Sequence, residues 1–149
     1  MNKLVIFDLD GVLIDSRDMH YEALNRALAV VDEEYVITRE EHLSVYDGLP
    51  TTRKLELLTE KKGLPVVEYD NIWQDKQTAT LDIFSELKPD YELMHYFQQL
   101  KDKGYSIAVA SNSVRNTVKL VLLRLGLLEF VHYFSVSYTH LTLPTIYSV

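Results

Sequence analysis

The stretch LVIFDLDGVLIDS, residues 4–16, decides the fold of this protein. Its first four residues are apolar and favour a strand, which predicts a short strand covered on both faces in a sheet. The strand ends at Asp8-Leu9-Asp10-Gly11, where glycine permits a tight turn. Open α/β sheets bind ligands in the crevice at the carboxyl ends of their strands. We therefore expect Asp8 and Asp10 to point into such a crevice.

The rest of the chain alternates helix and strand signals. Residues 18–86 show no strand pattern and read as a helical block, in which Thr38 to Glu41 has the form of a capping box. Strands are predicted at residues 105–110 and 131–136, each after an amphipathic helix. Ser113 is the expected N-cap of the second of these helices, and Gly126 its end. This order predicts an α/β fold with a parallel, Rossmann-like sheet and a helical insertion after the first strand.

Composition limits the class of protein. Of the 149 residues, 47% are hydrophobic and 25% charged, as in one globular core domain with a modest insertion. The net charge of −7 argues against nucleic acid or an acidic membrane surface as the main partner. The chain has no cysteine, which excludes disulfides and thiolate metal sites. The apolar run before Asp8 is too short for a signal peptide, and we expect a cytoplasmic protein.

Asp8 and Asp10 carry the predicted chemistry. Paired carboxylates at the end of a strand suit Mg²⁺, a cation that prefers oxygen ligands and bridges protein and phosphate. One of the two carboxylates can also act as a nucleophile that forms an aspartyl-phosphate. The alternative is two solvated aspartates at the end of a strand, and the pair by itself does not decide between these interpretations.

The longer motif around the two aspartates favours a catalytic role. Asp8 to Ser16 after an apolar strand resembles the first motif of the haloacid dehalogenase-like (HAD) phosphatases, and Ala110-Ser111-Asn112-Ser113 resembles their second. The resemblance implies that Gly11, Ser111 and Asn112 bind the substrate phosphate. A hydroxyl and backbone N–H groups at a strand-to-helix turn suit this role. Without Asp8, helix capping would be the favoured interpretation of the serines.

The resemblance also predicts the domains. It implies a discontinuous core of residues 1–15 and 87–137 and an inserted α-helical cap of residues 16–86, as in phosphoglycolate phosphatase-like and β-phosphoglucomutase-like proteins. In this cap His20 and Arg53 are candidate substrate-binding residues, and Arg53 is suited to a second anionic group of the substrate. For both residues the alternative is an ordinary solvated side chain on a helix.

By resemblance the activity is hydrolysis of a small phosphorylated metabolite. Asp8 is the expected nucleophile and Asp10 the acid and base, with Mg²⁺ held by the Asp8 side chain and the Asp10 carbonyl. A phosphate-sugar mutase of the same fold is one alternative, and a non-catalytic binding or regulatory protein that retains the fold is another. Residue spacing determines neither the substrate nor the oligomeric state.

The C-terminal stretch departs from this pattern. No Asp, Glu, Lys or Arg follows Glu129, whereas the family pattern continues with a lysine and an acidic pair that completes the metal site. Residues 138–149 resemble the conceptual translation of a sequencing adapter, and we expect them to be non-native. The predicted core is then incomplete at its C-terminus. The 149-residue chain is expected to be poorly soluble and nearly inactive.

Overall fold

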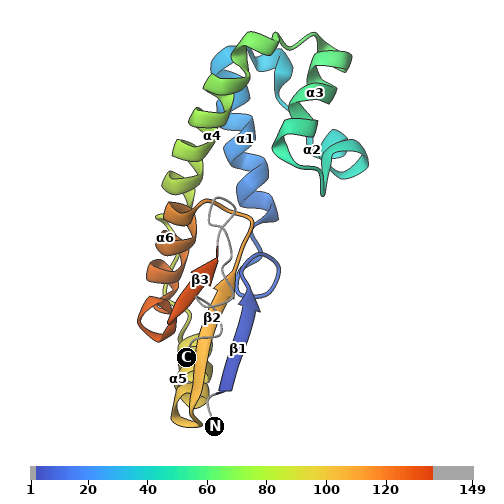
Figure 1. Ribbon diagram of the computed structural model, residues 1–149. Helices are drawn as coiled ribbons and strands as arrows, with labels where there is room; N and C mark the ends of the chain where they lie inside the picture. The colour runs from blue at the N-terminus through green and yellow to red at the C-terminus, as the bar shows by residue number, and fades with distance from the viewer. Residues whose placement is uncertain (1–2, 136–149) are drawn as a thin grey trace. The chain divides into compact units, whose positions relative to one another are not determined.

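A three-stranded parallel sheet carries the opening motif. The structure is a computed structural model that describes residues 3–135 (Figure 1). The strands β1 (Lys3–Asp8), β2 (Tyr105–Ala110) and β3 (Tyr133–Ser135) lie in the order β1-β2-β3. In the register, Asp8 lies opposite Ala110, and Ala110 lies opposite Ser135. The carboxyl ends of the strands therefore meet at one edge, as the sequence predicts for an α/β fold.

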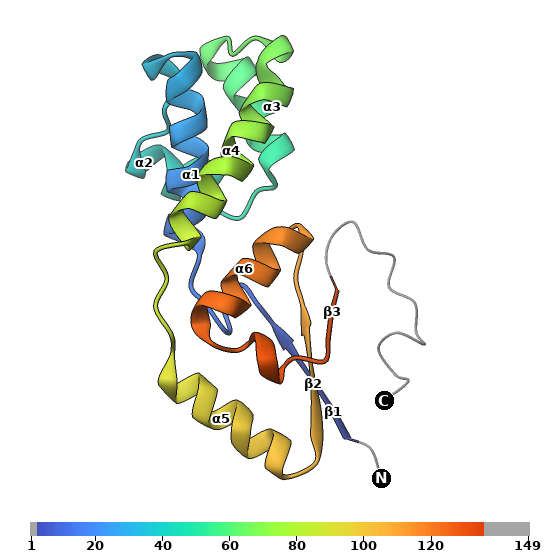
Figure 2. The ribbon, with the colours of Figure 1, turned by 90° about the vertical axis from the view of Figure 1, so that its left-hand side faces the viewer.

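Two helices pack on this sheet. They are α5 (Tyr91–Asp102) and α6 (Arg115–Leu125), followed by the short η4 (Leu128–Phe130). Both crossovers step across the sheet in the same direction, and right-handed crossovers then place both helices on one side, as Figure 2 shows. Phe97 of α5 is fully buried and stacks on Phe7 of β1, with ring centroids 4.9 Å apart. This contact fixes the strand that carries Asp8 to the helical layer.

One prediction about β1 is wrong for the residues that the structure describes. The strand is not covered on both faces, because Ile6 is 48% exposed. The helices α5 and α6 cover the side of the sheet that Phe7 faces, and within residues 3–135 β1 pairs with β2 alone. The strand therefore lies at the edge of the described sheet. An apolar residue exposed at such an edge favours aggregation.

The predicted helical block is confirmed, since the structure shows no strand within residues 18–86. Its regular elements are α1 (Arg17–Val31), η1 (Glu33–Tyr35), α2 (Arg39–Glu41), η2 (His42–Tyr46), α3 (Thr51–Lys62), η3 (Val66–Glu68) and α4 (Tyr69–Phe84). The capping box forms as predicted, with both reciprocal bonds between Thr38 and Glu41. After three residues α2 widens into η2, a turn of π-helix, which is a rare geometry that often lies near functional sites.

Residues 18–82 form a compact unit of their own, and the other described residues, 3–17 and 83–135, belong to a second unit. The core of the helical unit contains Leu24, Leu28, Leu58, Leu64 and Ile72, all buried. That this unit acts as a cap stays a prediction. The prediction of a non-native segment at residues 138–149 falls outside the described residues. Within the described part of the chain, no helix has the length and apolar character that crossing a membrane requires.

Candidate active site

The loop after β1 holds its shape by its own hydrogen bonds. The N–H of Gly11 donates to the Ile14 carbonyl at 2.7 Å, and the N–H groups of Leu13 and Ile14 both donate to the Leu9 carbonyl. Gly11 has a φ of +81°, which disfavours a side chain at this position. Leu9 and Leu13 are buried and anchor the loop to the core. The loop is therefore a fixed platform for the two aspartates.

The two carboxylates of this loop differ in their surroundings. Asp8 ends β1 and is exposed, so its side chain is accessible to a ligand. Asp10 is partly buried, and the hydroxyl of Ser16 donates a hydrogen bond to its Oδ1. Ser16 is only 2% exposed, which holds that hydroxyl in place. One carboxylate is thus open, and the other is oriented by a buried neighbour.

The loop after β2 lies beside this platform. The N–H of Leu9 donates to the Ala110 carbonyl at 3.1 Å, which joins the two strand ends directly before Ser111. The N–H of Ser113 donates to the Ser111 Oγ at 3.0 Å and closes a small turn. The predicted N-cap role of Ser113 is wrong, because this turn places Val114 at the N-cap of α6, where no side chain bonds the helix. The first N–H groups of α6 therefore have no side-chain cap.

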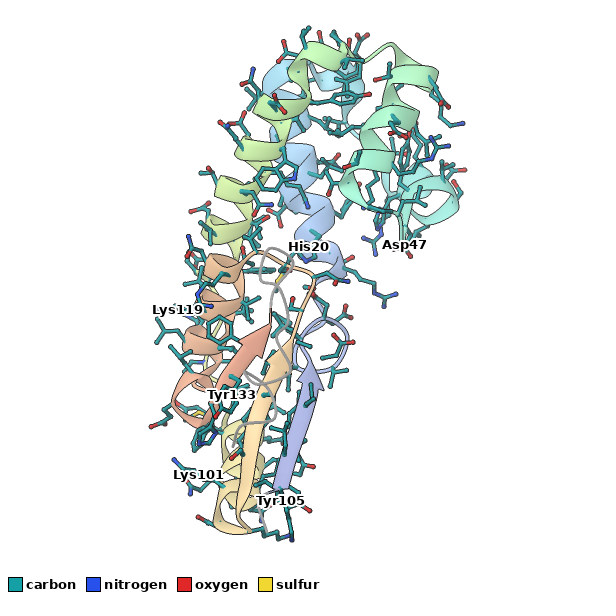
Figure 3. All side chains as sticks on the ribbon, in the orientation of Figure 1. His20, Asp47, Lys101, Tyr105, Lys119 and Tyr133 are labelled. Atoms are coloured by element: carbon teal, nitrogen blue, oxygen red, sulfur yellow. The ribbon has the colours of Figure 1, made fainter. Side chains whose placement is uncertain are left out.

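The structure brings together five of the seven predicted site residues. Asp8, Asp10 and Gly11 follow β1, and Ser111 and Asn112 follow the adjacent β2, at the same edge of the sheet. The other two, His20 and Arg53, belong to the helical unit, and Figure 3 labels His20 near the start of α1. The contribution of each residue to a reaction stays a prediction.

Arg53 forms ion pairs with two glutamates of its own helix. Its Nη1 lies 3.1 Å from Glu56 and 3.8 Å from Glu60, and all three side chains are about half exposed or more. Surface ion pairs of this kind are weak, but they reduce the attraction of the arginine for a further anion. Arg53 is therefore a poorer candidate for an anion contact than the sequence indicated.

The donor set at the sheet edge fits Mg²⁺ in its chemistry. Mg²⁺ usually keeps several waters and binds one or two carboxylates together with substrate phosphates. Asp8 supplies an exposed carboxylate of this type, and Asp10 lies two residues away. Among residues 3–135 no group of three or more His, Asp or Glu gathers into a metal site. The candidate ligands among the described residues are therefore the two aspartates.

Two lysines of the helical unit were missed from the sequence. Lys54 of α3 and Lys76 of α4 are partly buried, and burial lowers the pKa of both ammonium groups. The sequence offers a signal for Lys76, because Ile72, Lys76 and Thr80 follow one another at i, i+4 spacing and so share one face of the helix. The structure shows that Ile72 and Thr80 on this face are buried. A charged side chain on the buried face of a helix is uncommon.

Known proteins match most of the length of this chain. The sequence profile described as "Haloacid dehalogenase-like hydrolase" matches residues 5–143. The phosphoglycolate phosphatase of Aquifex aeolicus (strain VF5) is 29% identical over 121 residues, which are 80% of this chain and 54% of that protein. The chain thus spans about half the length of this curated relative.

Solved structures share the fold. A putative beta-phosphoglucomutase from Thermotoga maritima has a TM-score of 0.70 at 25% identity, over 97% of this chain and 67% of that one. A predicted phosphoglycolate phosphatase from Haemophilus somnus 129pt has a TM-score of 0.72 at 19% identity, over 94% and 64% respectively. These matches confirm the predicted Rossmann-like α/β fold.

Proposed function

Since the chain belongs to the haloacid dehalogenase-like hydrolase family, we propose that the protein is a Mg²⁺-dependent phosphohydrolase of a small phosphorylated metabolite. The reaction proceeds through an aspartyl-phosphate. The observation that supports this most is the meeting of an open carboxylate, an oriented carboxylate and a serine turn at one sheet edge. A protein that only bound its ligand would not need this nucleophile.

Asp8 is the proposed nucleophile. Its carboxylate is exposed at the end of β1, where it can attack the phosphorus in line with the leaving oxygen. The P–O bond to the leaving group breaks as the bond to Asp8 forms. Water then attacks the phosphorus of the aspartyl-phosphate, which releases inorganic phosphate and restores Asp8.

Asp10 is the proposed acid and base. In the first step its protonated carboxyl gives a proton to the leaving oxygen, and in the second it takes a proton from the attacking water. The hydrogen bond that the Ser16 hydroxyl donates to one oxygen of Asp10 orients the carboxyl group for this role. When bound, Mg²⁺ would be held by Asp8 and Asp10 and would supply positive charge against the charge that develops on the phosphoryl group.

The turn at Ser111 is proposed to hold the phosphoryl oxygens. The Ser111 hydroxyl oxygen accepts from the Ser113 N–H, so its own proton is available to an anion. Asn112 is exposed on the same turn, and the uncapped start of α6 adds backbone N–H groups. Gly11 acts through the shape of its loop, because its own N–H bonds Ile14. His20 stays a candidate for contact with the leaving group.

Acid-quench labelling tests the proposal. The chain is mixed with Mg²⁺ and a panel of ³²P-labelled phosphomonoesters, and protein-bound label is measured. We expect label on Asp8 that is lost in Asp8→Asn and retained longer in Asp10→Asn. Label retention is the primary readout, because the described residues bring only the aspartate pair to the site and slow turnover is expected. Equal labelling of wild type and Asp8→Asn, or none with any ester, would contradict the proposal.

Phosphate-sugar mutase activity is the second candidate. It uses the same two aspartates but returns the phosphoryl group to a sugar phosphate instead of water. The structural likeness to a putative beta-phosphoglucomutase supports keeping it. Release of inorganic phosphate from sugar phosphates favours the hydrolase, and conversion between sugar phosphates without release favours the mutase. A cytoplasmic location without nucleic-acid or membrane partners stays a prediction from the acidic net charge.

A further inference from the structure

A partly buried lysine of the helical unit lies beside a second lysine. The Nζ of Lys76 on α4 donates a hydrogen bond to the Thr51 Oγ1 on α3 at 3.0 Å, which joins the two helices. Lys54 lies three residues after Thr51 and so on the same side of the first turn of α3. Its charge reaches Lys76, since it lowers the pKa of that lysine. A hydroxyl and two amino groups therefore meet between these two helices.

The two lysines differ in their acidic neighbours. Asp47, which Figure 3 labels on the segment that leads into α3, raises the pKa of Lys54 against the larger effect of burial. Among the described residues no acid raises the pKa of Lys76, and its hydrogen bond goes to the neutral hydroxyl of Thr51. Lys54 is therefore the residue of the pair that keeps its positive charge, and Lys76 is the one that loses its proton first.

The surroundings of Lys76 favour a free amine. Burial is the largest cause that lowers its pKa, to about 8, and the charge of Lys54 lowers it further. A neutral amine has an electron pair with which it can attack an electrophile, whereas an ammonium group has none. The charged form also repels Lys54, because both groups are partly removed from water. A reaction that gave Lys76 a negative charge would turn this repulsion into attraction.

We propose that Lys76 is a site of reversible carbamate formation with carbon dioxide, and that Thr51 and Lys54 hold the product. The electron pair of Nζ attacks the carbon of CO₂ and forms an N–C bond, while a π electron pair of the C=O bond moves onto oxygen. A proton then leaves Nζ for the solvent, and nothing is oxidised or reduced. The product keeps an N–H for the bond to Thr51 and gains a carboxylate that pairs with the Lys54 ammonium group.

Carbon dioxide suits this position better than a charged reagent does. It is small and uncharged, so it reaches a partly buried amine without the desolvation cost of an ion. The carboxylate that forms then has a cation beside it. The start of α3 favours the same charge, because Pro50 at the N-cap leaves the first N–H groups without a side-chain partner. All of these residues belong to the helical unit, so the inference does not depend on the proposed function.

Chemical trapping tests the proposal. The full chain is equilibrated with ¹³C-labelled bicarbonate and CO₂ at a pH of about 8, where half of the Lys76 side chains are neutral. A trialkyloxonium salt then converts the carbamate to a stable ester, which peptide mapping by mass spectrometry locates. We expect the labelled ester on Lys76. The ¹³C NMR spectrum of the untreated protein should show a carbamate signal that acid removes, and that is absent in Lys76→Met.

Lys54→Met tests the role of the neighbouring cation. A hydrogen bond to a charged group changes an equilibrium constant by about tenfold to hundredfold, so the formation constant of the carbamate should fall at least tenfold. Lys54→Arg retains a cation and should retain the carbamate. Bicarbonate in place of chloride, at equal pH and ionic strength, should raise the urea midpoint of the wild type but not that of Lys76→Met.

The controls separate a specific site from general amine reactivity. Lys61→Met removes an exposed lysine of α3 and should leave the label on Lys76 unchanged. If Lys76→Met alters the fold, Lys76→Arg, which cannot form this carbamate, should show the same loss of signal. No label on Lys76, label on Lys54 or Lys61 at the level of Lys76, or a formation constant that Lys54→Met leaves unchanged would overturn the inference.

Discussion

Replacing Lys76 with Met is predicted to stabilise the helical unit near neutral pH. Methionine has a similar length and volume but no charge to keep away from water. In the wild type the ammonium group is partly buried between α3 and α4, beside Lys54. The substitution removes both the burial cost and the repulsion.

The size of the effect follows from the pKa of Lys76. Folding lowers it from 10.5 to about 8. At about 1.4 kcal/mol per pH unit, the charged form costs the folded state roughly 3 kcal/mol at pH 7. Loss of the hydrogen bond to Thr51 offsets about 1 kcal/mol of this. Lys76→Met is therefore expected to raise the free energy of unfolding by about 2 kcal/mol.

The pH dependence gives an independent check. Between pH 8 and 10.5 the unfolded chain binds more protons at Lys76 than the folded chain does, so wild-type stability rises with pH in this window. Methionine at position 76 does not titrate, so the variant lacks this contribution to the pH dependence. Its advantage should therefore shrink as the pH rises from 8 towards 10.5.

Urea unfolding monitored by tryptophan fluorescence measures both effects. The chain has one tryptophan, Trp73, one turn before Lys76 on α4, so the signal reports on the helical unit. Lys61→Met serves as the exposed control and should change stability by less than about 0.5 kcal/mol. A Lys76→Met protein that is less stable than wild type at pH 7, or whose advantage does not change with pH, would refute the reasoning.

Three further predictions concern packing and capping. Phe97→Ala removes the ring that stacks on Phe7 and should lower the free energy of unfolding by about 3–5 kcal/mol. Hydrogen exchange of the β1 and β2 amides measures this loss. Gly126→Ala places a Cβ 2.6 Å from the Met94 sulfur, at a φ of +80° that disfavours any side chain. Thermal unfolding should show that the free energy of unfolding falls by about 1–3 kcal/mol. Adding Met94→Ala should relieve the steric contact but not the backbone strain. Thr38→Ala breaks the capping box and should lower the stability of the helical unit by about 0.5–2 kcal/mol in urea, with exposed Thr52→Ala as control.

The sequence predicted a helix or strand correctly where neighbouring residues determine it. The strand at residues 105–110, the end of α6 at Gly126 and the capping box of Thr38 each depend on neighbouring residues. The N-cap of α6 was misplaced by one residue, because a hydrogen bond between Ser111 and Ser113 extends the turn. Small competing bonds of this kind are not visible in a pattern of residue types.

The sequence by itself also determined the aspartate pair, because the strand, the turn and the proposed nucleophile are contiguous in residues 4–16. Only the tertiary structure placed Ser111 beside Asp8, through parallel pairing of strands about a hundred residues apart. It also decided the surroundings of the cations in the helical unit. Arg53 meets glutamates of its own helix, whereas Lys54 and Lys76 come together from two helices. The burial of a charge depends on what packs against it, and that is a property of the fold and not of the neighbouring sequence.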